Sequence, residues 1–197
     1  MSTLSTTPDR GLHSPARRTF LSRTGAATLS ASAVALIVGC ESMAKDQMAS
    51  SDGMKADIDI LNTAVAAEHE AIAAYQVGAE SGLLQKPVLD LAVQFQGHHK
   101  EHADVLAGAV AQLGGTPAQP MAKYDFPVDT LKSQADVLRF AAGLEQGAAS
   151  AYLGAVPLFD NRDLAKAAAS ILGDEAMHWA VLRQALGENP VPSAFIA

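Results

Sequence analysis

The sequence predicts an all-α protein, an antiparallel four-helix bundle of two helical hairpins, on three observations. Apolar residues recur at alternating steps of three and four in four segments between residues 57 and 188, and no segment alternates as a β-strand would. Glycine and proline lie where these segments end. The second pair of segments repeats the glutamate, tyrosine and histidine spacing of the first pair, which indicates two copies of one hairpin.

The composition limits the class of protein before any single residue is considered. The chain has 197 residues, of which 49% are apolar, 18% charged and 5% aromatic, which fits one domain or one domain with an appendage. The formal net charge is −7, and the first 39 residues are basic whereas the remainder is acidic. An acidic domain without a basic patch argues against nucleic-acid binding, which begins with neutralisation of the phosphates. Because Cys40 is the only cysteine, an intrachain disulfide, an iron–sulfur cluster and a thiolate zinc site are all excluded.

The first predicted hairpin consists of two helices whose apolar stripes are interrupted by ionisable residues. On its first helix Glu68 takes a place in the stripe, seven residues before Tyr75. On its second helix His99 and His102 are spaced so that both point inward. The residues that suit the end of the first helix and the first turn of the second are Gly82 and Pro87.

The second predicted hairpin repeats this arrangement. Glu145 again precedes a tyrosine, Tyr152, by seven residues. On the last helix Glu175 and His178 lie three apart and project to the same inward side. The residues that suit the end of the third helix and the cap of the fourth are Pro157 and either Asp160 or Asn161.

The two hairpins are joined by a long connection between Leu113 and Ser133. It has about 19 residues, is rich in glycine and proline, and can reach on the order of 60 Å when extended. A helix of about 25 residues is only about 37 Å long. The connection can therefore cross the full length of the bundle, which predicts that the second and third helices run parallel.

Glutamates on buried helix faces need a positive partner, because an isolated carboxylate in an apolar interior costs more free energy than a fold can supply. Arg and Lys are missing from the same stripe positions, so the partners are either protons or metal ions. Histidines at neighbouring inward positions supply neutral nitrogen ligands. A metal centre is the economical explanation, with the candidate ligands Glu68, His99, His102, Glu145, Glu175 and His178.

Other residues near the stripes have an ordinary interpretation beside a functional one. His98 is a further ligand, a donor to a ligand or a residue at the rim. Tyr75 and Tyr152 are core aromatics unless their hydroxyls hydrogen-bond to a ligand carboxylate. We interpret His69 as an edge histidine and Trp179 as a packing residue.

From about residue 57 to residue 187 the chain resembles the ferritin-like superfamily of carboxylate-bridged dimetal proteins, in particular its small bacterial ferritin-like domain and rubrerythrin-like members. The superfamily has one Glu from each of two helices and a Glu-x-x-His from each of the other two. Glu68 and Glu145 match the single glutamates, and Glu175 to His178 matches one full motif. The resemblance implies a centre of two ions, Fe or Mn, in the bundle core.

The second helix departs from this pattern, because His99 stands where the superfamily has Glu, three residues before His102. With three carboxylates rather than four, two divalent ions leave one excess positive charge, which a bridging hydroxide or a one-ion site would remove. A swing of Glu101 toward the metal is a third solution, although Glu101 lies about 100° from His102 around the helix and should face outward. A shell richer in nitrogen also suits Zn, Cu or Ni.

The first forty residues are interpreted as a targeting segment. Arg17 and Arg18 precede Phe-Leu and a weakly apolar run of 13 residues, which is too short to span about 30 Å of hydrocarbon. This order resembles a bacterial twin-arginine export signal, and the small residue before Cys40 resembles a lipoprotein cleavage box, the alternative being an ordinary signal cut elsewhere. The predicted organisation is a signal, a flexible tether from lipidated Cys40, the bundle and a tail, at 1–39, 40–56, 57–188 and 189–197.

Together these resemblances imply a metalloprotein exported by the twin-arginine machinery and held on the periplasmic side of the inner or outer membrane by a lipid alone. The implied function is iron handling or protection against oxidative stress, by oxidation of Fe(II) or removal of peroxide. A non-catalytic metal-binding or stress-related bundle, with an inert or vestigial site, is the alternative, so whether the protein is an enzyme stays open. The cofactor is two ions of Fe or Mn, with one ion or Zn as alternatives, and a homodimer is compatible with the sequence.

Overall fold

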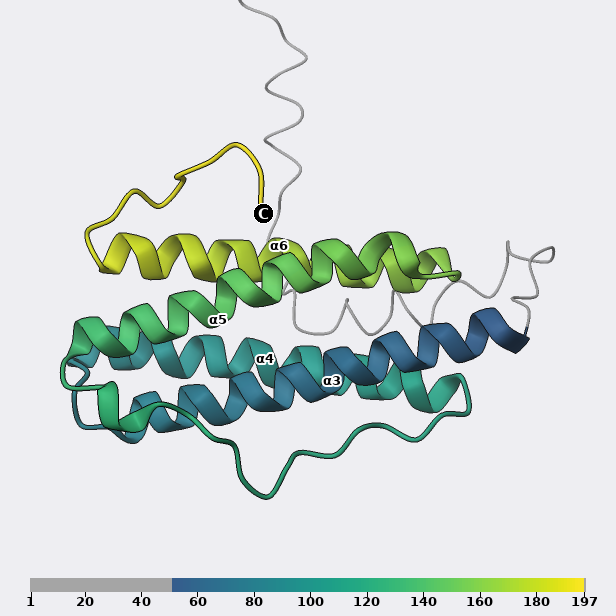
Figure 1. Cartoon of the computed structure of the whole chain (residues 1–197), viewed down its shortest axis with the longest axis horizontal. Coiled ribbons are helices and arrows are strands. Elements are labelled where there is room, and N and C mark those ends of the chain that lie inside the picture. The colour runs from purple at the N-terminus through teal and green to yellow at the C-terminus, as the bar shows by residue number, and fades with distance from the viewer. Residues whose placement is uncertain (1–50, 197) are drawn as a thin grey trace, which may run out of the picture. The chain divides into compact units, whose positions relative to one another are not determined.

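The computed structural model describes residues 51–196, which form four long α-helices and contain no strand (Figure 1). The all-α prediction is therefore confirmed. The helices are α3 (Ser51–Glu80), α4 (Lys86–Gln112), α5 (Gln134–Ala155) and α6 (Arg162–Ala185), with short 3-10 turns η1 (Val128–Thr130) and η2 (Val156–Leu158). None of the helices in this part of the chain is long and apolar enough to cross a membrane. The predictions for Arg17, Arg18 and Cys40 lie outside the described residues.

The helices form two antiparallel hairpins, α3 with α4 and α5 with α6, and the two hairpins pack against each other (Figure 1). The connection after α4 runs back along the length of the bundle before α5 begins, so α4 and α5 point in the same direction, as the length of the connection predicts. It is fixed to α3 by Asn62, whose side-chain amide donates to the Thr116 carbonyl at 3.1 Å and accepts from the Ala118 amide at 2.7 Å. The four-helix bundle with one long crossover is thus the observed fold.

The ends of the helices follow from local sequence. Gly82, in the turn between α3 and α4, has a φ of 70°, which costs glycine little because it lacks a Cβ. Pro87 occupies the first turn of α4, where its missing N–H leaves no helical hydrogen bond unmade. Ser133 caps α5 and Asn161 caps α6, each by accepting from a backbone amide of the first turn. Of the two candidate caps for the last helix, Asn161 is the one the structure uses.

The first helix begins at Ser51, six residues before the expected start at Asp57, so the end of the predicted tether is helical. These residues lack an apolar stripe and are held by other contacts. Lys55 and Asp59 form an exposed ion pair of 2.6 Å one turn apart. Asp57 is buried, and its carboxylate accepts from the backbone amides of Asp160 and Asn161 at 2.8 and 3.0 Å. Asp57 thus fastens α3 to the start of α6.

The core consists of two apolar clusters with a polar layer between them. One cluster includes Leu61, Leu106 and Ile171, and the other includes Phe95 and Leu182. On every helix buried ionisable residues fall between the positions that contribute to the two clusters, and Asp57, near the start of α3, is the exception. The apolar clusters therefore close the polar layer off from both ends of the bundle.

Candidate metal centre

Six ionisable side chains from all four helices meet in the polar layer. Five of them are at most 3% exposed, and the side chain of His102 is 14% exposed. They form two overlapping groups, and the potential ligand atoms in each group lie within 4.8 Å of one another. The first group is Glu68, His99, His102 and Glu175, and the second is His99, Glu145, Glu175 and His178. The structure thus brings together all six residues that the sequence singles out.

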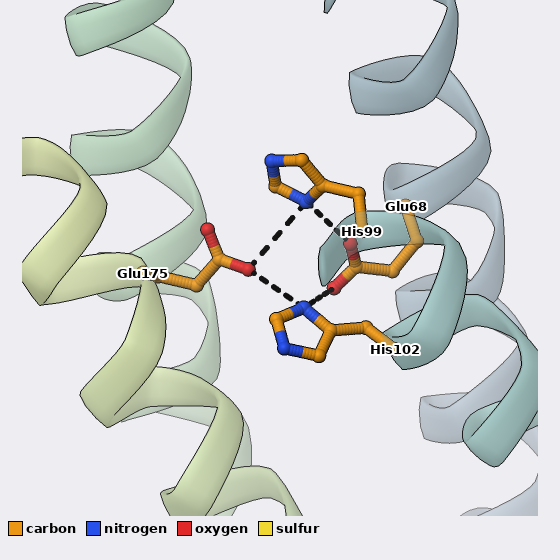
Figure 2. Close-up of side chains that lie close together, drawn as sticks. All are labelled: Glu68, His99, His102 and Glu175. Atoms are coloured by element: carbon orange, nitrogen blue, oxygen red, sulfur yellow. Dashed lines mark hydrogen bonds and ion pairs between the residues drawn. The ribbon is translucent and has the colours of Figure 1, made fainter. Parts of the chain in front are cut away.

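Figure 2 shows the first group, in which Glu175 of α6 faces the α3–α4 hairpin. Its Oε1 lies 3.1 Å from His102 Nδ1 and 3.6 Å from His99 Nδ1. Glu68 lies on the other side of both histidines, with Oε2 at 2.8 Å from His99 Nδ1 and Oε1 at 3.6 Å from His102 Nδ1. Two carboxylates and two imidazoles therefore surround one point.

The second group repeats this arrangement with the other oxygen of Glu175. His178 Nδ1 lies 3.5 Å from Glu145 Oε2 and 3.8 Å from Glu175 Oε2. The second nitrogen of His99, Nε2, lies 3.3 Å from Glu145 Oε1. Glu175 thus gives one oxygen to each group, and His99 gives one nitrogen to each group.

Several of these buried atoms lack a hydrogen-bond partner. Within residues 51–196 they are His102 Nδ1, Glu145 Oε2, both carboxylate oxygens of Glu175, and His178 Nδ1. Unpartnered polar atoms in an apolar interior are costly, and native proteins contain few of them. Since all five face into the two groups, the arrangement fits divalent ions, for which carboxylate oxygens and imidazole nitrogens are suitable ligands.

Two tyrosines connect the hairpins to each other through hydrogen bonds to Glu145 and Glu68. Tyr75 of α3 donates its hydroxyl hydrogen to Glu145 of α5, and Tyr152 of α5 donates to Glu68 of α3. Burial and the neighbouring carboxylate raise the pKa of each tyrosine well above its usual value, so both stay protonated and remain donors. The functional interpretation of these tyrosines, a hydrogen bond to a glutamate of the cluster, is the one that the geometry supports.

In the absence of a metal, protons balance the charge of the cluster. Burial lowers the pKa of each histidine, but the carboxylates outweigh burial and raise the pKa to about 9 for His99 and to about 11 for His102 and His178. Burial likewise raises the pKa of Glu145, but the neighbouring imidazoles of His178 and His99 outweigh burial and hold that pKa well below its usual value. Three imidazolium ions therefore face the glutamates near neutral pH. A metal ion must displace these protons to bind.

Asp174 belongs to the site, and the sequence reasoning missed it. Its Oδ2 lies 3.2 Å from His178 Nε2 and 3.4 Å from His102 Nε2, on the side of each ring that faces away from the two groups. The same oxygen lies 3.0 Å from His98 Nδ1. The missed signal is the i,i+4 spacing of Asp174 and His178, which puts both on one side of α6.

The remaining candidates lie outside the two groups. Glu101 is exposed, as its position on the helix predicts, and takes part in neither group. His98 lies at the rim, with 34% of its side chain exposed. His69 is partly exposed and joins no cluster of potential ligands among the described residues. Trp179 packs against the cluster that contains Leu182. The guanidinium carbon of Arg183 lies over its ring, 5.4 Å from the ring centroid.

Comparisons with known proteins agree with this geometry. A family model described as Ferritin-like domain matches residues 56–188. Among solved structures, the chain is similar to the crystal structure of a conserved hypothetical protein, rv2844, from Mycobacterium tuberculosis. That similarity has a TM-score of 0.63 and 26% sequence identity, and it covers 73% of this chain and 99% of the other. The chain matches none of the curated proteins.

Proposed function

The chain belongs to the ferritin-like domain family, and we propose that it is an exported metalloprotein that uses two Fe or Mn ions in iron handling or in protection against oxidants. One observation carries the proposal: the five buried, unpartnered polar atoms that face one another from α4, α5 and α6. Protons can balance the net charge of this cluster but leave these five atoms without hydrogen bonds. Divalent ions would both offset the negative charge of the glutamates and give these five atoms partners.

We propose that the ligands divide between two ions. Glu68, His102 and Oε1 of Glu175 would hold the first. Glu145, His178 and Oε2 of Glu175 would hold the second. His99 lies between these two sets with one nitrogen toward each, where the family pattern has Glu.

When bound, Fe or Mn would supply electron transfer toward oxygen or peroxide at open coordination positions. The chain's own residues fix the ligands. The Tyr75 and Tyr152 hydroxyls hold the carboxylates of Glu145 and Glu68 by hydrogen bonds. Asp174 faces the outer nitrogens of two histidines, so the inner nitrogens stay directed at the ions. The apolar clusters close the two ends of the polar layer.

The location of the protein is part of the proposal and is supported by the N-terminal residues. Arg17, Arg18 and Cys40 have the order of a twin-arginine signal followed by a lipoprotein cleavage box. Export of a folded protein allows a metal to be inserted before the chain leaves the cytoplasm. The partners proposed on this basis are the twin-arginine machinery and a membrane that holds the protein through lipid on Cys40.

The second candidate function is metal binding without turnover, and His99 favours it. Replacing the family's glutamate by an imidazole leaves two divalent ions with one excess positive charge among three glutamates. Such a centre retains affinity while losing reactivity toward oxygen. The only cysteine of the chain is Cys40, so a rubredoxin-type electron donor within the chain is excluded.

Elemental analysis of protein matured through its native export route tests these proposals, followed by an Fe(II) oxidation assay. We expect about two ions per chain for a two-ion centre, with oxygen consumption for the first function and without it for the second. A metal content at background would contradict both. Glu145→Ala with Glu175→Ala should remove the metal, whereas the exposed Glu101→Ala on α4 is the matched control and should not.

A further inference from the structure

A third cluster of potential ligands lies at the rim of the centre. The proposed function uses two of its members, His178 and Asp174, only for the inner centre and assigns His98 no role. It consists of His98, Asp174 and His178, whose potential ligand atoms lie within 4.8 Å of one another. His98 Nδ1 lies 2.8 Å from His178 Nε2 and 3.0 Å from Asp174 Oδ2, and Asp174 Oδ2 lies 3.2 Å from His178 Nε2. Two imidazole nitrogens and one carboxylate oxygen thus form a nearly equilateral triangle.

The size of this triangle fits one face of a metal coordination shell. Ligand atoms about 2.1 Å from an ion lie about 3.0 Å apart in octahedral geometry and about 3.4 Å apart in tetrahedral geometry. The three measured edges, 2.8, 3.0 and 3.2 Å, come close to these separations. Two histidines and one carboxylate on one face, with the other positions open, are also a donor set that suits Fe(II).

The cluster lies nearer to solvent than the two inner groups. The side chains of His98 and Asp174 are 34% and 23% exposed, whereas those of Glu68, Glu145 and Glu175 are at most 3% exposed. An ion from solution therefore reaches His98 and Asp174 without crossing the apolar core. Its remaining coordination positions would be filled by water.

His178 links the rim to the interior. Its Nε2 faces His98 and Asp174, and its Nδ1 faces Glu145 and Glu175. A neutral imidazole has one nitrogen with a free lone pair, so it binds an ion on one side at a time. An ion held at the rim by His178 and an ion held inside by His178 are therefore alternatives.

We propose that His98, Asp174 and the outer nitrogen of His178 form a separate site for a divalent first-row transition ion, through which ions are loaded into the inner centre. This inference rests on the proposed function, because it names the route by which the same centre is filled. His98 and Asp174 belong to neither inner group, and His98 is the better residue to substitute because Asp174 also contacts His102.

Equilibrium binding of Co²⁺ to the full chain tests the outer site directly. Glu68→Gln with Glu145→Gln weakens the inner groups by near-isosteric changes and leaves the outer three residues in place. We expect this double variant to bind one Co²⁺ ion at the outer site. Adding His98→Ala should lower the Co²⁺ affinity of that site on the order of tenfold or more. His69→Ala in the same background is the matched control, because His69 is a partly exposed histidine outside all three groups. Equal Co²⁺ binding with and without His98 would overturn the proposal.

The rate of Co²⁺ uptake by the otherwise unchanged chain is the second test, and it does not depend on the folding of the double variant. In stopped-flow absorbance, His98→Ala should load on the order of tenfold more slowly than the unchanged chain and reach the same final content, while His69→Ala should load at the unchanged rate. Identical rates for His98→Ala and His69→Ala would overturn the loading role. An unchanged chain that binds no Co²⁺ at all would contradict the proposed function itself, so the two failures are distinguishable.

Discussion

Among single residues, Glu175 is the carboxylate that belongs to both inner groups of the centre. It is fully buried, and each of its oxygens lacks a hydrogen-bond partner within residues 51–196 while facing a different group. Glu175→Gln should therefore remove both ions, because the amide carries no charge and gives only one oxygen. Glu68→Gln should mainly weaken the ion on its own side. Inductively coupled plasma mass spectrometry, after removal of loosely bound ions, measures the metal content of the two variants.

Glu101→Gln is the control for this comparison, since it makes the same chemical change at an exposed position of α4. Its metal content should equal that of the unchanged chain. If Glu175→Gln loses no more metal than Glu68→Gln, Glu175 is not shared between the two ions.

His99 supplies a second prediction. It is 1% exposed and stands where the family pattern has Glu. His99→Glu should restore four carboxylates and neutralise the charge of two divalent ions, so we expect tighter binding of the second ion and faster oxidation of Fe(II). Titration with Mn²⁺ measures the affinity, and oxygen uptake measures the reaction. Weaker binding of both ions would show that the imidazole is a needed ligand rather than an obstacle to reactivity.

The sequence places the six residues of the cluster at inward positions but does not determine their partners. Helical spacing alone puts Glu68 and Glu145 inside, because each interrupts an apolar stripe. The partners of Tyr75 and Tyr152 could not be predicted in the same way, since each tyrosine reaches a glutamate of the opposite hairpin. The role of Asp174 could not be predicted either, because it lies at the edge of the stripe and contacts only the outer nitrogens of the histidines.

At the scale of elements, Asp57 joins two helices that are far apart in the sequence. Its carboxylate accepts from the amides of Asp160 and Asn161, just before α6 begins. Asp57→Ala leaves these amides without their acceptor and should lower the free energy of unfolding by about 1–3 kcal/mol. Urea unfolding followed by circular dichroism measures this change.

Asp59→Ala is the matched control for Asp57→Ala. Asp59 lies on the same helix, but its ion pair with Lys55 is largely exposed, so its removal should change the free energy of unfolding by no more than about 0.5 kcal/mol. Equal effects of the two substitutions would mean that the buried contact of Asp57 adds no stability.

Element by element, the sequence predicts the helices well where an apolar stripe specifies them. The turn at Gly82, the long crossover and the cap of α6 follow from residue types with a known conformational preference. The start of α3 at Ser51 cannot be predicted in this way, because residues 51–56 have no apolar stripe and are held by contacts such as the Lys55–Asp59 ion pair. Stability that comes from such contacts leaves little periodic signal in a sequence.

For the whole molecule, the histidine cluster predicts a dependence of stability on pH when metal is removed. The pKa of His99 is raised to about 9, and those of His102 and His178 to about 11, from about 6.5 in the unfolded chain. Because the folded state binds these protons more tightly than the unfolded chain, the protonated histidines stabilise the fold fully below about pH 6.5. This stabilisation is lost as the pH rises toward 9 to 11. The lowered pKa values of Glu68 and Glu145 act in the opposite direction and stabilise the fold above about pH 4.5.

The chelated protein should therefore have its highest melting temperature between about pH 5 and pH 6.5 and melt at progressively lower temperature up to pH 10. In the presence of Mn²⁺ this decline should be smaller, because deprotonated histidines bind the ion more tightly. Thermal unfolding with chelator and with Mn²⁺ across this range checks both statements. A melting temperature that stays constant from pH 6.5 to pH 10 in chelator would contradict the raised pKa values.

The crossed tyrosine contacts make the two hairpins depend on each other. Tyr75 of the first hairpin donates to Glu145 of the second, and Tyr152 of the second donates to Glu68 of the first. One hairpin by itself can form neither hydrogen bond. The two glutamates are therefore held in place only when the hairpins pack together, so docking of the hairpins and assembly of the centre are one event.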